Sequence, residues 1–337
     1  MNEWQYKFPE TTRNGWLDKA SLDLRGKPLE SIQTDWWPGE IRHPFHHHDD
    51  YSGEPIVLPS QLFNTAPILI EWIEVKDDND NSINKKILGA LQYGAQSIIL
   101  DIRRPDVSIA TILQSVIRDF ISVSVEFADE VQMDSKSIPE DIIVRHKEAV
   151  TNYKLHSVEK FVFDISAEGN WIQKATDLFK NILEINKRAS VMSGQNILSQ
   201  CILRYIPDCD YLKQIIQTRV LHLIWQEILS KYPSSSTSHP YLECHIQPGT
   251  EKDPDKYLIQ ASASALAASQ TGVHALCIHP IRQNKVPEYY LRVNRNIHHL
   301  LNMESEMYKG VDPLAGSYVI DFYARKWSNG ILANLFS

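Results

Sequence analysis

The sequence has few glycines, and their spacing excludes several common catalytic and nucleotide-binding motifs. None of the 13 glycines forms a G-x-G pair, so the dinucleotide-binding fingerprint is absent. The G-x-x-x-x-G-K-[ST] phosphate loop and the G-x-S-x-G turn of serine hydrolases are absent as well. No single glycine-based motif therefore identifies an active site.

Cysteine is also scarce, and its placement argues against a disulfide framework. The four cysteines lie in separate apolar or strand-like contexts and form no C-x-x-C pair: Cys201, Cys209, Cys244 and Cys277. This pattern favours reduced thiols in the core over disulfides or a zinc site. Free buried thiols are typical of a reducing compartment, and we expect a cytoplasmic protein.

Neither long apolar runs nor an excess of basic residues is present. The 34 basic and 42 acidic side chains give a net charge of −8, which offers no attraction to nucleic acid or to an anionic membrane. No apolar run approaches the length needed to cross a bilayer, and the first residues, MNEWQYKFPETTRNGW, lack the order of a secretory signal. We therefore expect no nucleic-acid partner and no membrane association.

What the sequence does have is a regular alternation of short β-rich and helical runs from Pro67 onward. This order predicts parallel strands joined by crossover helices. The predicted strands are Ile68–Val75, Gln96–Ile102, Ile121–Phe127, Lys160–Ile165, Cys201–Ile206, Tyr241–Ile246 and His274–His279. The predicted helices cover about 83–93, 106–118, 170–185, 210–231, 255–270 and 287–308.

Seven strands are one short of a TIM-type (β/α)8 barrel. The missing strand would fall between about 130 and 158, a region too short for two full units. We therefore predict an α/β fold with a (β/α)8-type barrel that is degenerate around its fourth strand, spanning residues 65–337. Residues 1–64, rich in Trp, Pro and His, are predicted to form an extended amino-terminal arm.

The predicted strands carry bulky side chains on both faces, among them Ile68, Ile70 and Trp72. A ligand tunnel along the barrel axis would need small or polar inward residues in several strands at once. We therefore expect a filled barrel.

A histidine-rich loop in the arm raises the question of a metal site. His43, His46, His47 and His48 are followed by Asp49 and Asp50, and imidazole and carboxylate groups are transition-metal ligands. Consecutive histidines on a proline-bounded loop cannot all converge on one ion. A solvated or partner-facing loop is the favoured interpretation, and we assign no metal site.

Polar residues at the carboxyl ends of the predicted strands are candidate catalytic residues, because barrel enzymes place their active sites there. Arg103 and Arg104 could bind a phosphate or carboxylate, but an ion pair with Asp101 is the simpler interpretation. His279 could act as a general base or be hydrogen-bonded locally. Arg103, Arg104 and His279 are retained as substrate-binding candidates; the other polar residues at strand ends are Glu126, Asp129, Asp164, Glu168 and Gln247.

The segment NRNIHHLLNMESEMYKGVDPLAGSYVID resembles the closing part of the barrel in cobalamin-dependent methylmalonyl-CoA mutases. In that family an Arg-Asn pair begins a helix, Glu-Ser follows, and Asp-Pro-x-x-Gly-Ser-Tyr ends it. The corresponding residues here are Arg295, Asn296, Glu304, Ser305, Asp312, Pro313, Gly316, Ser317 and Tyr318. TRVLHLIW, from Thr218 to Trp225, and the amino-terminal WLDKASLDLRGKPLESIQTDWWPGEIRHP are similar to further family segments in the same order. The resemblance is greatest to the small, non-catalytic (beta) subunit of heterodimeric mutases.

Departures from the family pattern bear on function. The family's cobalamin-binding motif is D-x-H-x-x-G, and none of the 13 histidines has an Asp two residues before it; the chain also ends at Ser337. The Tyr, Gln and Gly-Tyr-His elements that contact the acyl group in catalytic subunits are not kept. The resemblance therefore implies a chain with no catalytic residues of its own, a pseudoenzyme that binds no cofactor.

By resemblance, the partner would be a catalytic subunit that binds adenosylcobalamin, in a heterodimer that interconverts methylmalonyl-CoA and succinyl-CoA. A homodimer is the other assembly considered. Two alternatives for function stay open: an acyl-CoA-binding isomerase that uses cobalamin from a separate chain, and a self-associating scaffold or sensor without a mutase partner.

Overall fold

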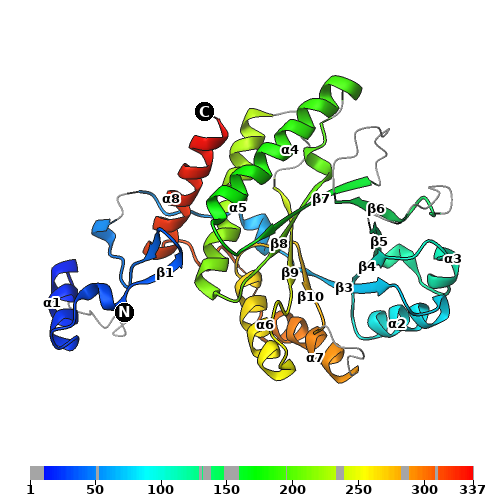
Figure 1. Ribbon diagram of the computed structural model, residues 1–337, viewed down its shortest axis with the longest axis horizontal. Coiled ribbons are helices and arrows are strands. Elements are labelled where there is room, and N and C mark those ends of the chain that lie inside the picture. Colours follow the sequence, from blue (N-terminus) through cyan, green and yellow to red (C-terminus); the bar gives the residue numbers. More distant parts are fainter. Residues whose placement is uncertain are drawn as a thin grey trace, which may run out of the picture.

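The computed structural model describes residues 11–50, 53–128, 131, 138–147, 159–194, 196–232, 239–281, 288–307 and 310–336. Its centre is a closed barrel of eight parallel strands, surrounded by helices, with the amino-terminal arm lying against the last helix (Figure 1). The predicted (β/α)8-type fold is confirmed. None of the described helices combines the length and apolarity that a bilayer crossing requires.

The barrel strands follow one another in chain order, and the last pairs with the first. They are β3 (Ile68–Val75), β4 (Ser97–Ile102), β5 (Ser122–Phe127), β6 (Ile143–His146), β7 (Glu159–Ser166), β8 (Cys201–Ile206), β9 (Tyr241–Ile246) and β10 (Ala275–Ile278). The fourth strand, β6, has four residues and lies inside the interval where the missing strand was expected. Residues 148–158, between β6 and β7, lie outside the described residues.

The helices are α1 (Arg13–Asp23), α2 (Asp80–Gln92), α3 (Ile109–Ile112), α4 (Trp171–Ser193), α5 (Tyr211–Lys231), α6 (Pro254–Ser269), α7 (Glu288–His299) and α8 (Tyr318–Leu335). The prediction of a helix over 106–118 was wrong. Only the four residues of α3 are α-helical there, because the chain leaves the helix at Leu113 and turns at Ser115, whose φ is 64°. The helix predicted over 287–308 is interrupted too: α7 gives way to a π-helical turn over Leu300–Glu304.

The two faces of the strands differ in chemistry. Outward residues of β4 and β5 join an apolar cluster with the buried face of α2, which includes Ile83 and Ile87. Inward residues of β3, β4 and β10 form a small apolar group of Ile70, Ile99, Ala275 and Cys277, with Trp72 packed against it. Bulky inward side chains fill the barrel, as predicted, but β5, β6, β8 and β9 each carry one buried inward residue that is charged, which was not expected.

The arm contains a two-stranded antiparallel sheet, β1 (Thr34–Trp37) and β2 (Glu40–Arg42), that docks on α8. The Trp37 ring lies 5.1 Å from that of Trp327. Glu40 accepts hydrogen bonds from Trp327 Nε1 (2.8 Å) and Lys326 Nζ (2.9 Å). The arm is thereby attached to α8, while the proposed boundary at residue 64 stays a prediction.

Helix α5 is buried on nearly all sides. Its apolar residues pack into the core, and α8 lies beside it (Figure 1). Polar residues are buried on the barrel side as well: Gln217 accepts a hydrogen bond from Tyr205 of β8, and His222 lies near His274, which precedes β10. Burial lowers the pKa of His222 from 6.5 to about 3, helped by the neighbouring His274 and His239. His222 is therefore neutral in the folded protein across the physiological range.

One buried ion pair joins three distant parts of the chain. Arg219 on α5 donates from Nη1 to Asp312 Oδ1 (2.8 Å) and from Nη2 to the carbonyl oxygen of Ile56 (2.6 Å). Asp312 in turn accepts from the backbone N–H groups of Leu58 (2.9 Å) and Leu314 (3.1 Å). Both charged side chains are fully inaccessible to solvent. Asp312 of the DPLAG turn is therefore a packing residue in this protein.

Replacing Asp312 with Asn should lower the free energy of unfolding by about 3–5 kcal/mol, because a buried Arg219 would lose its counter-charge. Urea denaturation followed by circular dichroism measures the change. The matched control is Asp141→Asn, which breaks the half-exposed pair between Arg118 and Asp141 (2.7 Å) and should cost less than about 1 kcal/mol. Equal losses in the two variants would contradict the structural role of Asp312.

Because His222 is buried in its neutral form, we expect the free energy of unfolding to fall in acid. Its folded pKa of about 3 lies below the ordinary 6.5, so between these values the unfolded chain binds a proton that the folded chain does not. Stability should fall by about 1.4 kcal/mol per pH unit from this residue as pH drops through that window. His222→Gln should therefore reduce the difference in unfolding free energy between pH 7 and pH 5 by about 2 kcal/mol. An unchanged difference would show that His222 does not contribute.

Candidate functional site

Four buried charged side chains contact one another inside the barrel. Glu126 on β5, Arg145 on β6, Arg204 on β8 and Glu243 on β9 are each at most 6% exposed. Their neighbours along the strands, such as Val125 and Leu203, belong to the outer apolar clusters. Because side chains alternate across a strand, the charged residues point inward. We refer to these four residues as the interior charge layer.

The interior charge layer is paired by direct contacts. Arg145 binds Glu243 through two parallel hydrogen bonds, Nη1 to Oε2 and Nη2 to Oε1, each 2.8 Å long. Arg204 binds Glu126 and also approaches Asp164 Oδ1 at 3.4 Å. Arg145 Nη1 lies 3.8 Å from Glu126 Oε1, which connects the two pairs. Charges are therefore bridged across the axis of the barrel.

The two carboxylates of the layer have different electrostatic surroundings. Burial would raise the pKa of Glu243, but Arg145 and the hydrogen bonds from His245 and Arg145 hold that pKa well below its usual range. Burial raises the pKa of Glu126, although Arg204 and Arg145 oppose the shift. Glu243 is thus an anion at neutral pH, and Glu126 is the carboxylate that protonates more readily.

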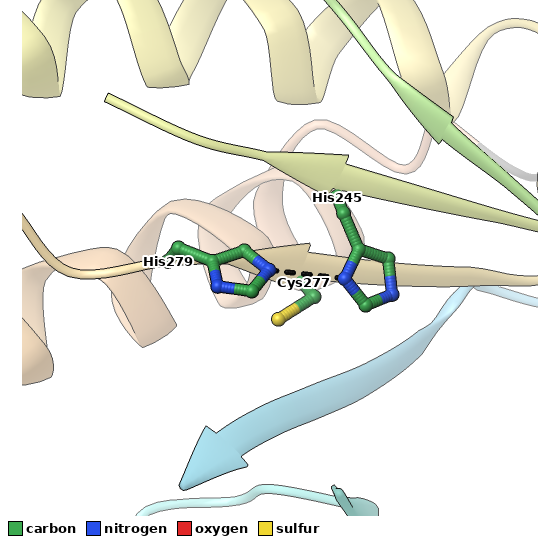
Figure 2. A group of neighbouring side chains, drawn as sticks. All are labelled: His245, Cys277 and His279. Atoms are coloured by element: carbon green, nitrogen blue, oxygen red, sulfur yellow. Dashed lines mark hydrogen bonds between the residues drawn. The ribbon is translucent and has the colours of Figure 1, made fainter. Parts of the chain in front are cut away.

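A second group, His245, Cys277 and His279, adjoins the layer at the carboxyl ends of β9 and β10. Figure 2 shows the three side chains projecting from these two strands toward one another. His245 Nδ1 lies 3.0 Å from His279 Nε2, and His245 Nε2 lies 3.1 Å from Glu243 Oε2. The Trp72 ring packs beside both imidazoles, with centroid distances of 5.8 and 5.1 Å. We call this group the His-Cys-His cluster.

The ionisation states in the cluster follow from burial. Loss of solvent lowers the pKa of His245 to about 4, even though Glu243 favours the charged form. Burial likewise raises the pKa of the Cys277 thiol well above its ordinary value. At neutral pH the folded chain therefore presents a neutral imidazole and an un-ionised thiol at this point. Neutral imidazole and cysteine sulfur are both ligands for transition metals.

The three substrate-binding candidates from the sequence do not share one site. Arg103 donates from Nε and Nη2 to Asp101 Oδ2 (2.9 and 2.8 Å) and approaches Glu74. Arg104 binds Asp80 at the start of α2, together with Asp106. Only His279 joins the His-Cys-His cluster. The arginines thus have acidic partners within the chain, and Asp129 lies outside the described residues.

The residues missed at the sequence level are Arg145, Arg204, Glu243, His245 and Cys277. Arg145 was missed because no strand was predicted around it. Arg204 was missed because it lies within a predicted apolar strand, where nothing marks it as functional. A detectable signal was the spacing Glu243-x-His245 and Cys277-x-His279, which places both members of each pair on one face of a strand. Their contact across strands could not be inferred without the register.

The histidine-rich loop lies outside the barrel. It borders a groove of about 710 Å³ between the arm and the start of α8, lined by residues that include Arg42, His43, His46, Leu212 and Tyr318. His47, His48 and Asp49 lie close together, with His48 62% and Asp49 53% exposed in their side chains. The interpretation as a solvated or partner-facing loop stays a prediction.

The chain matches the family model for methylmalonyl-CoA mutase over residues 191–335, which runs from the end of α4 through α8. Over 94% of its length it is 20% identical to the methylmalonyl-CoA mutase small subunit of Porphyromonas gingivalis, of which it covers 60%. It is 29% identical to Escherichia coli methylmalonyl-CoA mutase over 118 residues, which are 33% of this chain and 16% of that protein. The chain thus spans only part of the length of these relatives.

Among solved structures, Yersinia pestis DHPS with a pterine-sulfa conjugate overlaps 72% of this chain and 94% of its own, with a TM-score of 0.42 and 12% identity. An overlap this loose carries no argument about function. The sequence matches, by contrast, confirm the resemblance predicted from the motifs: the chain is similar to the methylmalonyl-CoA mutases, and along nearly its whole length to a small subunit of that family.

Proposed function

We propose that this chain is a non-catalytic, small-subunit-like component of a methylmalonyl-CoA mutase. Its partner would be a longer catalytic chain that carries adenosylcobalamin, and the assembly would interconvert methylmalonyl-CoA and succinyl-CoA. The observation that carries the proposal is the similarity to a mutase small subunit over 94% of this chain, arm and barrel together.

The interior of the barrel supports a structural role. An acyl-CoA that entered along the axis would need an open passage lined by small or polar groups. Instead, Arg145–Glu243 and Arg204–Glu126 span the interior, and Arg204 Cζ lies 5.2 Å from the centre of the Trp72 ring. Long paired side chains of this kind fill space and satisfy one another. The interior therefore favours packing over substrate binding.

The residues of this chain do not fit cobalamin. The nearest approach to the D-x-H-x-x-G motif is Glu243-x-His245, which has Glu for Asp and Pro248 in place of the glycine. Both Glu243 and His245 are fully buried inside the barrel, where a corrin ring could not reach the imidazole. We therefore assign the cofactor to the partner and derive no step through it.

Affinity purification of the tagged chain from its source organism tests the proposal. We expect a longer chain that carries D-x-H-x-x-G to co-purify, and mutase activity to appear with the complex but not with this chain alone. Isothermal calorimetry of the isolated chain with methylmalonyl-CoA and succinyl-CoA should give no binding heat. Acyl-CoA binding would favour the isomerase alternative, and a homodimer without a longer chain would favour the scaffold alternative.

The structural role of the interior charge layer predicts that Glu243→Gln lowers the free energy of unfolding by about 3–5 kcal/mol, because Arg145 stays buried without a counter-charge. Chemical denaturation measures the loss. Asp164→Asn is the matched control, since Asp164 also contacts an arginine of the layer but its side chain is 47% exposed; its cost should be below about 1 kcal/mol. Residues that serve substrate binding often lower the stability of the fold. A Glu243→Gln variant whose free energy of unfolding is unchanged or higher would therefore argue against a packing role for Glu243.

A further inference from the structure

We propose that the His-Cys-His cluster binds one transition-metal ion of the zinc type inside the barrel. The inference rests on His245, Cys277 and His279 alone and does not depend on the proposed mutase assembly. These side chains come from two adjacent strands, and their positions are set by the parallel register that pairs Cys277 with His245. A rigid sheet thus places the three donor groups at one point.

The donor atoms are close enough to share an ion. One atom from each residue, an imidazole nitrogen or the sulfur, lies within 4.8 Å of the other two. Zinc binds nitrogen at ~2.0–2.1 Å and sulfur at ~2.3 Å, so tetrahedral ligand atoms are about 3.3–3.7 Å apart. The nitrogens of His245 and His279, now 3.0 Å apart, would separate by a few tenths of an ångström. The sulfur would need to approach the nitrogens by up to about 1.5 Å.

His245 has the kind of hydrogen-bond partner that metal-binding histidines commonly have on the ring nitrogen that does not bind the metal. Its Nε2 faces Glu243 Oε2 at 3.1 Å, so the proton of this ring is held by the carboxylate and the lone pair of Nδ1 faces His279. Glu243 is itself fixed by two hydrogen bonds from Arg145. A carboxylate that orients an imidazole in this way sets its tautomer and strengthens it as a ligand.

The charges around the His-Cys-His cluster and its position near the carboxyl end of the barrel would allow a cation to enter and bind. The two arginines of the interior charge layer are balanced by Glu126 and Glu243, and Asp164 adds a further negative charge beside Arg204. The Cys277 thiol would lose its proton on binding and add another. His279 is only half-buried, which leaves the carboxyl end of the barrel as the entry side. Three protein ligands also leave one tetrahedral position for water.

The competing interpretation is a packed core in which two histidines share a hydrogen bond and Cys277 is a small apolar residue. Titration of the full-length protein with Co²⁺, a spectroscopic substitute for zinc, separates the two. We expect one ion per chain and a thiolate-to-cobalt charge-transfer band in the near ultraviolet. Zinc should abolish the band by displacement. No band in the unsubstituted protein would overturn the proposal.

Variants locate the site. Cys277→Ser should remove the charge-transfer band, and His245→Gln or His279→Gln should weaken binding by more than the ~10–100-fold typical of second-shell partners. Cys244→Ser is the matched control: Cys244 is equally buried and adjoins His245, but it belongs to the outer core cluster. It should keep the band. Loss of binding only in His48→Ala would overturn the proposal, because it would assign the ion to the surface group of His47, His48 and Asp49.

X-ray absorption spectroscopy of the zinc-loaded, unsubstituted protein provides a measurement that no folding defect can obscure. The expected first shell contains one sulfur and two imidazole nitrogens at the distances typical of zinc. A first shell of nitrogen and oxygen only would overturn the proposal.

Discussion

The buried pair of Arg219 and Asp312 is the contact on which the rest of the architecture depends. It connects the central helix α5, the segment at Ile56–Leu58 that leads out of the arm, and the turn that precedes α8. Each charged group is inaccessible to solvent and would be costly without the other. Because α8 packs on α5 and receives the arm, this ion pair fixes α8 and the segment leading out of the arm against α5.

The same contact changes the meaning of the motif that carries the family resemblance. Asp312 lies in the DPLAG turn, and Arg295 near the start of the motif binds Glu71 on β3 through two hydrogen bonds of 3.0 Å. Both residues join elements that are far apart in the chain. The motif residues Arg295 and Asp312 therefore serve packing between the barrel and the helices outside it. The charges that fill the barrel include Arg145, which lies outside the region matched by the family model.

Prediction from the sequence succeeded where local patterns carry the information. The boundaries of β3, β8 and β9 were predicted to the residue, because these strands are apolar runs bounded by turns. It failed at residues 106–118, where an apolar pattern suggested a helix but the chain turns after Leu113. It also failed to anticipate that polar residues of α5 such as His222 are buried, because amphipathic spacing does not reveal which distant residues, here His274 and His239, come to lie beside them.

The sequence by itself determined the order of strands and helices, the family resemblance and the absence of a cobalamin-binding motif. These features are local or linear, and each can be read from neighbouring residues. Only the tertiary structure decided that Glu126, Arg145, Arg204 and Glu243 meet inside the barrel, and that His245 meets Cys277 and His279. Such contacts depend on the register between strands that are far apart in the chain; Arg145 and Glu243, for example, are separated by 98 residues. Register is set by the closure of the whole barrel, and no local pattern encodes it.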